Sequence, residues 1–257
     1  SKTLHAELAE HGVQFLDAPV TGSKPAAENG TLVFMVGGSE EAVNEHKDVF
    51  EAMGNRIFHM GASGSGSYAK LAHNTMVGIN ALGFIEGMAL ASKANVDLNK
   101  FYDIVMSGAA ASKQAELKGP KILSRDFSTQ FSAQLMHKDL RLAVQLTDQL
   151  QVTAPLLHLA KNVFEMGLCK GLGEQDLSAI VQCYEEWMGK SIERRRQEDH
   201  TPDVLLTKHD LKIERRKSVR VPMNIPLLIS VYQWEQEGSF SGQNIEGTLH
   251  DLSDSGL

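Results

Sequence analysis

A glycine-rich turn that runs directly into a helical pattern places a lysine and an asparagine four residues apart. The segment extends from Gly61 to Asn74, and its lysine is Lys70. Positions four apart share one face of a helix, so Lys70 and Asn74 are expected to point into the same space. An ammonium group and an amide beside a flexible loop could surround a small, oxygen-rich substrate. A solvated helix face is the alternative, and these residues alone leave both interpretations open.

Two further short segments carry side chains suited to the same chemistry. Thr21, Gly22 and Ser23 form a small-residue loop whose hydroxyl and backbone N–H groups could bind a carboxylate. Lys138 and Asp139 offer a cation and an anion side by side. Each segment has a structural alternative. Thr21-Gly22 could be an ordinary turn, and Lys138-Asp139 could be a solvated pair worth less than about 1 kcal/mol.

The composition is that of a globular protein with a substantial core. The chain has 257 residues, of which 42% are hydrophobic and 22% charged, and this suits one or two domains. A net charge of −7 argues against non-specific binding to nucleic acid, although residues 191–220 hold nine Lys/Arg against six Asp/Glu. Cys169 and Cys183 form no metal-type spacing, so we expect no metal site and reduced thiols in a cytoplasmic protein. The sequence has no run of about eighteen apolar residues, so no membrane span is expected.

The first 60 residues are predicted to form an α/β layer. The expected elements are a helix over 1–11, a strand over 13–20, a loop over 21–30, strands over 31–36 and 56–60, and a helix from the N-cap Ser39 to about residue 53. Strand, helix and strand of these lengths are typical of part of a layered α/β domain.

Residues 61–190 are predicted to form an all-helical domain. Its first helix, expected over 67–93, contains Gly78, Gly83 and Gly87, each of which costs about 1 kcal/mol relative to alanine. Glycines in a helix usually permit close approach of another backbone, so we expect this helix to be buried against neighbours or a second subunit. Further helical patterns cover 99–107, 133–150, 155–166 and 174–190.

The composition changes after Lys190. Residues 191–213 are polar and charged and are predicted to be a linker, whereas residues 214–257 show the strand patterns of a β-rich module. The expected strands cover 219–221, 226–234 and 247–252. Because the chain begins inside a helical pattern and ends directly after a strand pattern, we expect a fragment of a longer protein.

Four motifs occur in order along residues 1–190. They are Asp17–Leu32, which begins Asp-Ala-Pro-Val-Thr-Gly-Ser, then Gly61–Asn74, Phe131–Ala143 and Gly171–Ala179. Together they resemble the β-hydroxyacid dehydrogenases, and most closely the glyoxylate and succinic semialdehyde reductases. The resemblance implies the C-terminal part of a Rossmann-like NAD(P)-binding domain over 1–60, followed by the family's all-helical domain over 61–190.

The resemblance also implies a reaction, the reduction of a carbonyl group with NADP or NAD as hydride carrier and a side chain as proton donor. It assigns the proton to Lys70, because a shielded ammonium can have its pKa lowered toward the working pH. The other implied roles are substrate positioning by Asn74, carboxylate binding by Thr21, Gly22 and Ser23, a place near the nicotinamide for Lys138, and places near the active site for Asp139 and Phe131. His73 is interpreted as a packing residue.

The family's cofactor turn has no match in this sequence. The family binds its cofactor through an N-terminal Gly-x-Gly-x-x-Gly turn, where phosphates sit on a helix N-terminus. Here no such turn follows a strand, and about a hundred residues of the family's first domain are expected to be missing. We therefore expect the chain on its own to bind NADP(H) poorly.

A second resemblance concerns residues 214–257. Arg-x-x-x-Arg and Asp-x-Ser-x-x-Gly motifs are formed by Arg216, Arg220, Asp251, Ser253 and Gly256. These look like the paired motifs of PilZ domains, receptors for cyclic di-GMP, and imply a partial β-barrel. Guanidinium groups suit the recognition of phosphates and guanines. A basic linker followed by a hairpin is the alternative.

Two functions are therefore open. The first is an NAD(P)H-dependent reductase of small carbonyl compounds that carry a carboxylate, homo-oligomeric through its helical domain and fused to a cyclic di-GMP-binding module. The second is a non-enzymatic signalling protein, whose helical domain serves only dimerisation and whose terminal module senses cyclic di-GMP.

Overall fold

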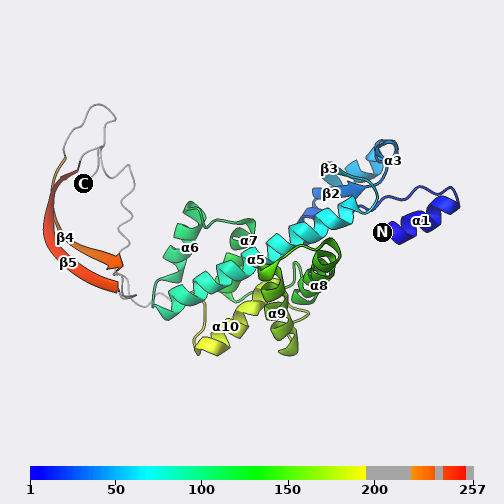
Figure 1. Ribbon diagram of the computed structural model, residues 1–257. Helices are drawn as coiled ribbons and strands as arrows, with labels where there is room; N and C mark the ends of the chain where they lie inside the picture. Colours follow the sequence, from blue (N-terminus) through cyan, green and yellow to red (C-terminus); the bar gives the residue numbers. More distant parts are fainter. Residues whose placement is uncertain (195–220, 235–239, 253–257) are drawn as a thin grey trace. The chain divides into compact units, whose positions relative to one another are not determined.

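The structure is a computed structural model that describes residues 1–194, 221–234 and 240–252 (Figure 1). It divides into two units, Ser1–Gln197 and Glu198–Leu257. The first unit holds all the side chains discussed below, and the second contributes one pair of strands.

A three-stranded sheet forms the first layer of the first unit. Its elements and the helices around it are α1 (Lys2–Glu10), β1 (Val20–Thr21), α2 (Ser23–Glu28), β2 (Leu32–Gly37), α3 (Glu40–Glu45), α4 (Lys47–Glu51) and β3 (Gly54–Gly61). The strand order is β1-β2-β3, with β1 antiparallel and β3 parallel to β2. Two predicted strands are thus confirmed as β2 and β3. Ser39 caps α3 as expected, because its hydroxyl accepts the Ala42 N–H at 3.2 Å.

Two local expectations for this layer are wrong. The strand predicted over 13–20 shrinks to the two residues of β1, because Pro19 has no N–H to donate to a strand ladder. The loop predicted over 21–30 contains the short helix α2. Gly22 makes this turn possible, since its φ is 121° and a Cβ there would lie only 2.4 Å from a side chain one turn later.

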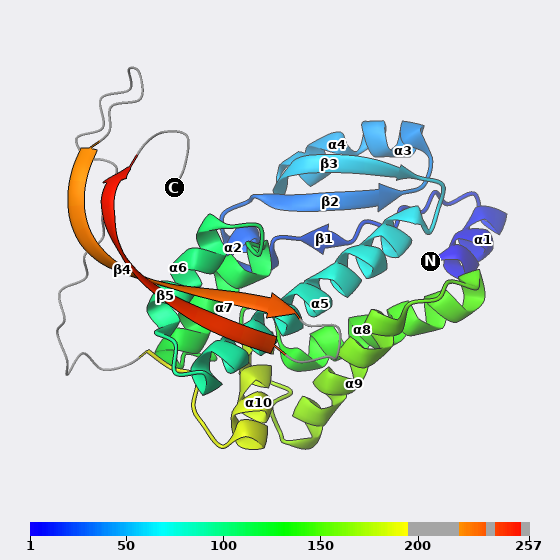
Figure 2. The ribbon, with the colours of Figure 1, turned by 60° about the vertical axis from the view of Figure 1, so that its left-hand side comes forward.

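Helices form the second layer of the first unit. They are α5 (Ser65–Lys93), α6 (Leu98–Ser107), α7 (Lys113–Ser124), α8 (Ala133–Leu150), α9 (Pro155–Cys169), the 3₁₀ turn η1 (Leu177–Ile180) and α10 (Val181–Met188). The long helix α5 joins the two layers, because it packs against β2 and β3 and also against α6, α7, α8, α9 and α10. In Figure 2, α5 lies on one side of the sheet, and α3 and α4 lie on the other.

The helix α7 was not expected from the sequence, because Gly119 and Pro120 look like a break. Both residues instead accommodate Tyr102 of α6. A Cβ on Gly119 would lie 2.2 Å from the Tyr102 ring, so only glycine leaves room for it. Pro120 cannot donate to the Glu116 carbonyl one turn earlier, and the Tyr102 hydroxyl donates to that oxygen at 3.5 Å instead.

One of the three glycines on α5 has the close neighbour that we expected. A Cβ on Gly78 would lie 3.1 Å from Leu140, so the glycine lets α5 and α8 approach each other. By contrast, nothing lies within 4 Å of a Cβ on Gly83, and Gly87 meets Phe101 only at 4.0 Å. Contacts among the residues that the structure describes therefore do not explain these two glycines.

By length and composition alone, α5 could cross a membrane, which differs from the sequence expectation of no such segment. It is the one helix of this kind in the part of the chain that the structure describes, with a mean hydropathy of 1.3. However, it packs against two strands and five helices, and it carries Lys70 and the buried Asn74. We therefore assign α5 as the core helix of the first unit.

A buried ion pair fixes the loop that precedes α8. Lys118 Nζ lies 2.9 Å from Asp176 Oδ2, and the two side chains are 5% and 0% exposed. The same oxygen accepts the N–H groups of Gln130 and Phe131 at 3.0 and 3.2 Å. Because loss of one partner would leave a buried charge at a cost of about 3–5 kcal/mol, this cluster holds the Phe131 loop in one conformation.

The second unit contains the antiparallel strands β4 (Val221–Trp234) and β5 (Phe240–Leu252). Both are longer than the strands predicted over 226–234 and 247–252. Among the PilZ-like motif residues, Asp251 lies in β5 opposite Pro222. The others lie outside the described residues, namely Arg216, Arg220, Ser253 and Gly256. The partial β-barrel therefore stays a prediction.

Candidate functional site

The carboxylate of Asp17 binds the glycine-rich turn at the start of α5. Its Oδ1 accepts the Gly64 N–H and its Oδ2 accepts the Ser67 N–H, both at 2.6 Å. Asp17 is 6% exposed, so both bonds are shielded from water. An anion at this place satisfies N–H groups that the helix leaves free and is stabilised by the helix dipole. Asp17 therefore fixes α5 to the chain segment that leads into β1.

The glycine-rich turn packs closely against the sheet. A Cβ on Gly66 would lie 2.3 Å from the Met35 carbonyl oxygen and 2.6 Å from that of Asp17. Only glycine allows this approach of α5 to β2. Asp17 occupies the N–H groups of Gly64 and Ser67, so these two groups are not available to a substrate. A place for the turn beside a substrate stays a prediction.

Lys70 lies three residues into the helix beyond this contact. Its Nζ donates to the Val20 carbonyl oxygen at 2.8 Å, which holds the ammonium group next to Thr21. Burial lowers the pKa of Lys70 below the ordinary value for lysine, the carboxylate of Asp139 opposes this shift, and the ammonium of Lys138 adds to it. A lysine with a lowered pKa can donate and accept a proton closer to neutral pH.

Asn74 and Asp139 form the buried side of the site. Asn74 is 2% exposed, and its Nδ2 donates to Asp139 Oδ2 at 2.6 Å. The other carboxylate oxygen, Oδ1, lies 3.1 Å from Lys138 Nζ. The interpretation of Lys138-Asp139 as a solvated pair holds for the half-exposed lysine only, because Asp139 is 8% exposed. The structure thus confirms that Lys70 and Asn74 share a helix face, which is directed toward Asp139.

His73 links this buried pair to the strand segment. Its Nδ1 lies 2.9 Å from Asn74 Oδ1, and its Nε2 lies 3.4 Å from Thr21 Oγ1. The interpretation of His73 as a packing residue is therefore wrong. Its position three residues after Lys70 and next to Asn74 was an available signal, since an imidazole can bond in two directions.

The remaining predicted residues lie around this cluster. Gly22 and Ser23 follow Thr21 directly, at the start of α2, and both are exposed. Phe131 packs against the main hydrophobic core, and its backbone is bound to Asp176 and Leu177. The roles of Gly22, Ser23 and Phe131 stay predictions.

The hydrogen-bond donors of this chain suit the nicotinamide end of a nicotinamide cofactor better than its phosphates. The half-exposed ammonium of Lys138 can still donate to a group bound beside the cluster. The N-terminus of α5, a type of position that often binds phosphates, is taken by Asp17. Among the residues that the structure describes, no three His, Cys, Asp or Glu side chains are grouped to hold a metal ion.

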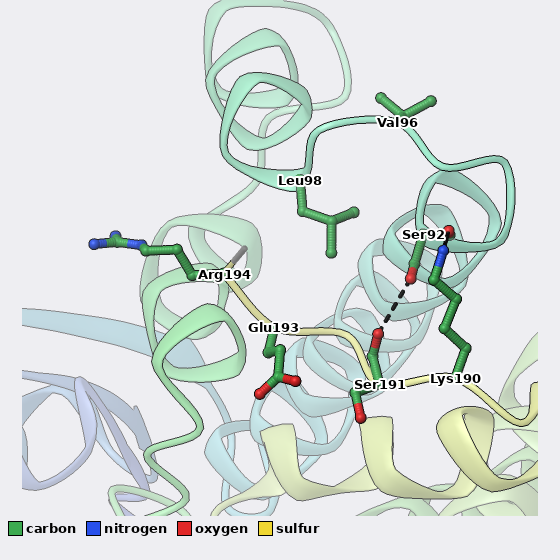
Figure 3. A pocket seen from close by; sticks show the side chains of 7 residues that line it. All are labelled: Ser92, Val96, Leu98, Lys190, Ser191, Glu193 and Arg194. Carbon is green, nitrogen blue, oxygen red and sulfur yellow. Dashed lines mark hydrogen bonds between the residues drawn. The ribbon is translucent and has the colours of Figure 1, made fainter. Parts of the chain in front are cut away.

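A separate pocket of about 460 Å³ lies at the C-terminal end of α5 (Figure 3). Its lining residues are Ser92, Val96, Leu98, Lys190, Ser191, Glu193 and Arg194. Polar groups here bind one another: Lys190 Nζ donates to Asn95 Oδ1 at 2.9 Å, and the Ser92 hydroxyl donates to the Ser191 carbonyl at 3.2 Å. None of the predicted site residues lines this pocket, so we assign it no catalytic role.

The contact between Asp17 and α5 can be tested by amide substitution. We expect Asp17→Asn to lower the free energy of unfolding by about 2 kcal/mol, because the amide can accept at only one of the two positions. Asp97→Asn is the matched control, since a single oxygen of Asp97 accepts both capping bonds of α6 and an amide oxygen can replace it. Denaturant unfolding measures both variants. Equal losses in the two would contradict the special role of Asp17.

Two family models match the chain. One covers residues 1–61 and is described as the NAD binding domain of 6-phosphogluconate dehydrogenase. The other covers residues 64–184 and is described as NAD-binding of NADP-dependent 3-hydroxyisobutyrate dehydrogenase. Together they extend over the sheet layer and through the helical layer into α10.

Three similar proteins agree with these models. The mitochondrial 3-hydroxyisobutyrate dehydrogenase of Drosophila melanogaster is 38% identical over 70% of this chain and 57% of its own length. The chloroplastic glyoxylate/succinic semialdehyde reductase 2 of Arabidopsis thaliana is 31% identical over 68% of this chain and 49% of its own length. A solved structure of Mycobacterium tuberculosis 3-hydroxyisobutyrate dehydrogenase with L-serine gives a TM-score of 0.66 at 29% identity, over 71% of this chain and 65% of that chain.

This chain therefore spans between about half and two thirds of the length of these three proteins. The family models, the relatives and the fold agree with one another. The chain belongs to the 3-hydroxyisobutyrate dehydrogenase-like β-hydroxyacid dehydrogenases.

Proposed function

We propose that this chain carries the proton-transfer and substrate-binding part of an NAD(P)-dependent oxidoreductase acting on small hydroxy acids and the corresponding carbonyl compounds. One observation carries the proposal. The partly buried ammonium of Lys70 is held at the Val20 carbonyl, beside Thr21, with the Asn74–Asp139 pair on the same side of α5. Membership of the dehydrogenase family supports the reaction class.

The residues of the chain supply binding, orientation and the proton. In reduction, Nζ of Lys70 donates its proton to the oxygen of the substrate carbonyl, and in oxidation the neutral amine accepts it. When bound, NADPH or NADH would supply the hydride for reduction, and NADP⁺ or NAD⁺ would accept it in oxidation. The Val20 carbonyl keeps Nζ in one direction, and Asp139 fixes the amide of Asn74, so that both donors are oriented before a substrate arrives.

We propose that the substrate carries a carboxylate. Glyoxylate, succinic semialdehyde, 3-hydroxyisobutyrate and L-serine, which appear in the names of the similar proteins, all have one. In this chain the small-residue segment Thr21-Gly22-Ser23 is the candidate for binding it, because Thr21 adjoins the Lys70–Val20 contact. As specific substrates we propose glyoxylate and succinic semialdehyde, and this choice rests on the resemblance of the motifs.

Binding of cyclic di-GMP has no comparable support. The matching family models end at residue 184, so this function rests on the motif around Arg216 and Asp251 alone. The non-enzymatic alternative depends on cyclic di-GMP binding as well, so it also rests on this motif alone. The division into residues 1–60, 61–190, 191–213 and 214–257 stays part of the proposal, and the ranges of the two family models support its first boundary. The cytoplasmic location also stays a prediction.

We also propose that a second copy of the chain packs against the exposed side of α5. Met76, Gly83 and Leu90 follow each other at intervals of seven residues and therefore lie along one side of the helix. Met76 and Leu90 are 64% and 74% exposed, and no atom of the described part of the chain lies within 4 Å of a Cβ placed on Gly83. The exposed side of α5 also carries the polar residues Asn80 and Glu86. A glycine midway between two exposed apolar side chains suits close contact with another helix.

Removing the ammonium of Lys70 tests the proposed reaction. In a version of the enzyme that also contains the family's cofactor-binding turn, we expect Lys70→Met to lower the rate of NADPH- or NADH-dependent reduction of glyoxylate or succinic semialdehyde by about 10²–10⁴-fold, because the proton donor is lost while the aliphatic stem stays. Lys47→Met, which removes an exposed lysine paired with Glu51, is the control and should leave the rate unchanged. A Lys70→Met enzyme of normal rate would rule out this proton donor.

The charges around Lys70 give a second prediction, on pH dependence. The Asp139 carboxylate raises the pKa of Lys70 and the Lys138 ammonium lowers it. Asp139→Asn should therefore shift the titration of Lys70 to lower pH, so that oxidation reaches its plateau at lower pH and reduction is lost at lower pH. Lys138→Gln should shift both in the opposite direction. NMR titration of the Lys70 side chain measures these shifts without turnover, and shifts of the same sign in both variants would contradict the assignment.

The proposed contact between two copies predicts the effect of charges on α5. Met76→Glu and Leu90→Glu should each convert an oligomer into monomers, because a carboxylate in an apolar contact loses its hydration. Leu156→Glu, at a side chain of α9 that is 60% exposed, is the control. Light scattering measures the mass in solution. An oligomer that survives both α5 substitutions, or a monomeric wild type, would exclude this interface.

A further inference from the structure

A chain of four polar side chains runs from α8 through α5 to β1. Its fixed end is Asp139, a carboxylate that Lys138 holds as an ion pair and that can only accept hydrogen bonds. The amide nitrogen of Asn74 must therefore face it, and Nδ2 donates to Asp139 Oδ2 at 2.6 Å. The oxygen of the amide, Oδ1, points the other way, toward His73.

The orientation of Asn74 fixes the tautomer of His73. Because the amide oxygen only accepts, Nδ1 of His73, at 2.9 Å, must carry a proton. The other ring nitrogen, Nε2, is left facing Thr21 Oγ1 at 3.4 Å. Whether Nε2 also carries a proton then decides which of these two atoms donates.

The two charge states of the ring direct the Thr21 hydroxyl differently. With a neutral ring, Nε2 accepts, so the hydroxyl points its only proton at His73 and presents lone pairs elsewhere, which repel a carboxylate. With a charged ring, Nε2–H donates to Oγ1, and the hydroxyl proton is free to bind an anion. A carboxylate at Thr21 therefore favours the charged ring.

We propose that His73 is a positioning residue that turns the Thr21 hydroxyl toward a substrate carboxylate and takes up a proton when that carboxylate binds. This inference rests on the proposed function, because it requires a carboxylate at Thr21. Among the described residues, Asn74 connects the ring to the carboxylate of Asp139, which also pairs with Lys138, and β1 contributes no charged side chain. The arriving carboxylate brings a negative charge to the side of the ring that faces Thr21, and this charge favours the protonated ring.

Calorimetric titration of the protein with 3-hydroxyisobutyrate between pH 5 and 8 tests this inference. Comparison of two buffers with different ionisation enthalpies counts the protons exchanged. For the wild type we expect uptake of up to about one proton per molecule bound, and an affinity that falls by up to about tenfold per pH unit as the ring loses its charge. The methyl ester of the same acid is the control ligand, for which neither effect is expected.

Two substitutions of His73 test the contacts of Nδ1 and Nε2 separately. His73→Gln places an amide near the position of Nε2, which can donate to Thr21 without taking up a proton, so the affinity should persist and lose its pH dependence. His73→Asn places its amide near Nδ1, keeps the bond to Asn74 and loses the one to Thr21. It should bind about tenfold more weakly and without proton uptake. Thermal unfolding of both variants verifies that they are folded.

The possible outcomes distinguish this inference from the proposed function. Wild-type pH dependence in His73→Gln or His73→Asn would overturn the role of His73 and leave the proposed function intact. A wild-type protein that binds neither 3-hydroxyisobutyrate nor glyoxylate at any pH would overturn both. Independently of any ligand, ¹⁵N NMR should show the neutral His73 ring protonated at Nδ1, and protonation at Nε2 instead would contradict the argument at its first step.

Discussion

The contact between the Asp17 carboxylate and the start of α5 is the interaction on which the rest of the site depends. The carboxylate accepts hydrogen bonds from two backbone N–H groups of the helix start. The helix therefore cannot shift or rotate against the strand segment without breaking a hydrogen bond that is shielded from water. Lys70 meets Val20 three residues further along both segments, and His73 meets Thr21 beyond that. Strand and helix thus run side by side through three successive contacts, and the first sets the register of the other two.

Burial changes the pKa of Lys70 more than any single neighbouring charge does. Asp139 is the anion that acts on Lys70, yet the pKa of Lys70 is lowered, because desolvation outweighs the attraction of that carboxylate. Part of the negative charge of Asp139 is engaged by Lys138 and Asn74. This division of partners lets the carboxylate of Asp139 act on Lys70 without raising the pKa of that lysine above its ordinary value.

The sequence predicted the regular elements well and their exceptions poorly. Apolar periodicity placed α5 and α8 to within two residues, since long amphipathic or buried helices leave a clear pattern. The helix α7 was missed because the use of Gly119-Pro120 as a seat for Tyr102 depends on a residue of another helix. Local propensity cannot show such a partner.

The same limit explains the candidate site. Lys70 and Asn74 could be predicted because helical spacing alone puts them on one face. The role of Asp17 could not be predicted, since its N–H partners Gly64 and Ser67 are 47 and 50 residues away. The glycines of that turn suggest ligand binding equally well. His73 was interpreted as a packing residue because its bond to Thr21 bridges 52 residues. Its place next to Asn74 was the local signal, but that signal does not identify Thr21 as the second partner.

The use of an internal anion at the start of α5 constrains how an external anion can be recognised. A free helix N-terminus would offer a substrate carboxylate its N–H groups and its dipole, but both are already satisfied by Asp17. Recognition at Thr21 must then come from side-chain donors, whose direction depends on their own partners. A hydroxyl has a single proton to give, so the group behind it decides where that proton points. In the proposed binding mode that group is the imidazole of His73, so the polarity of the Asp139–Asn74–His73 chain would take part in substrate binding.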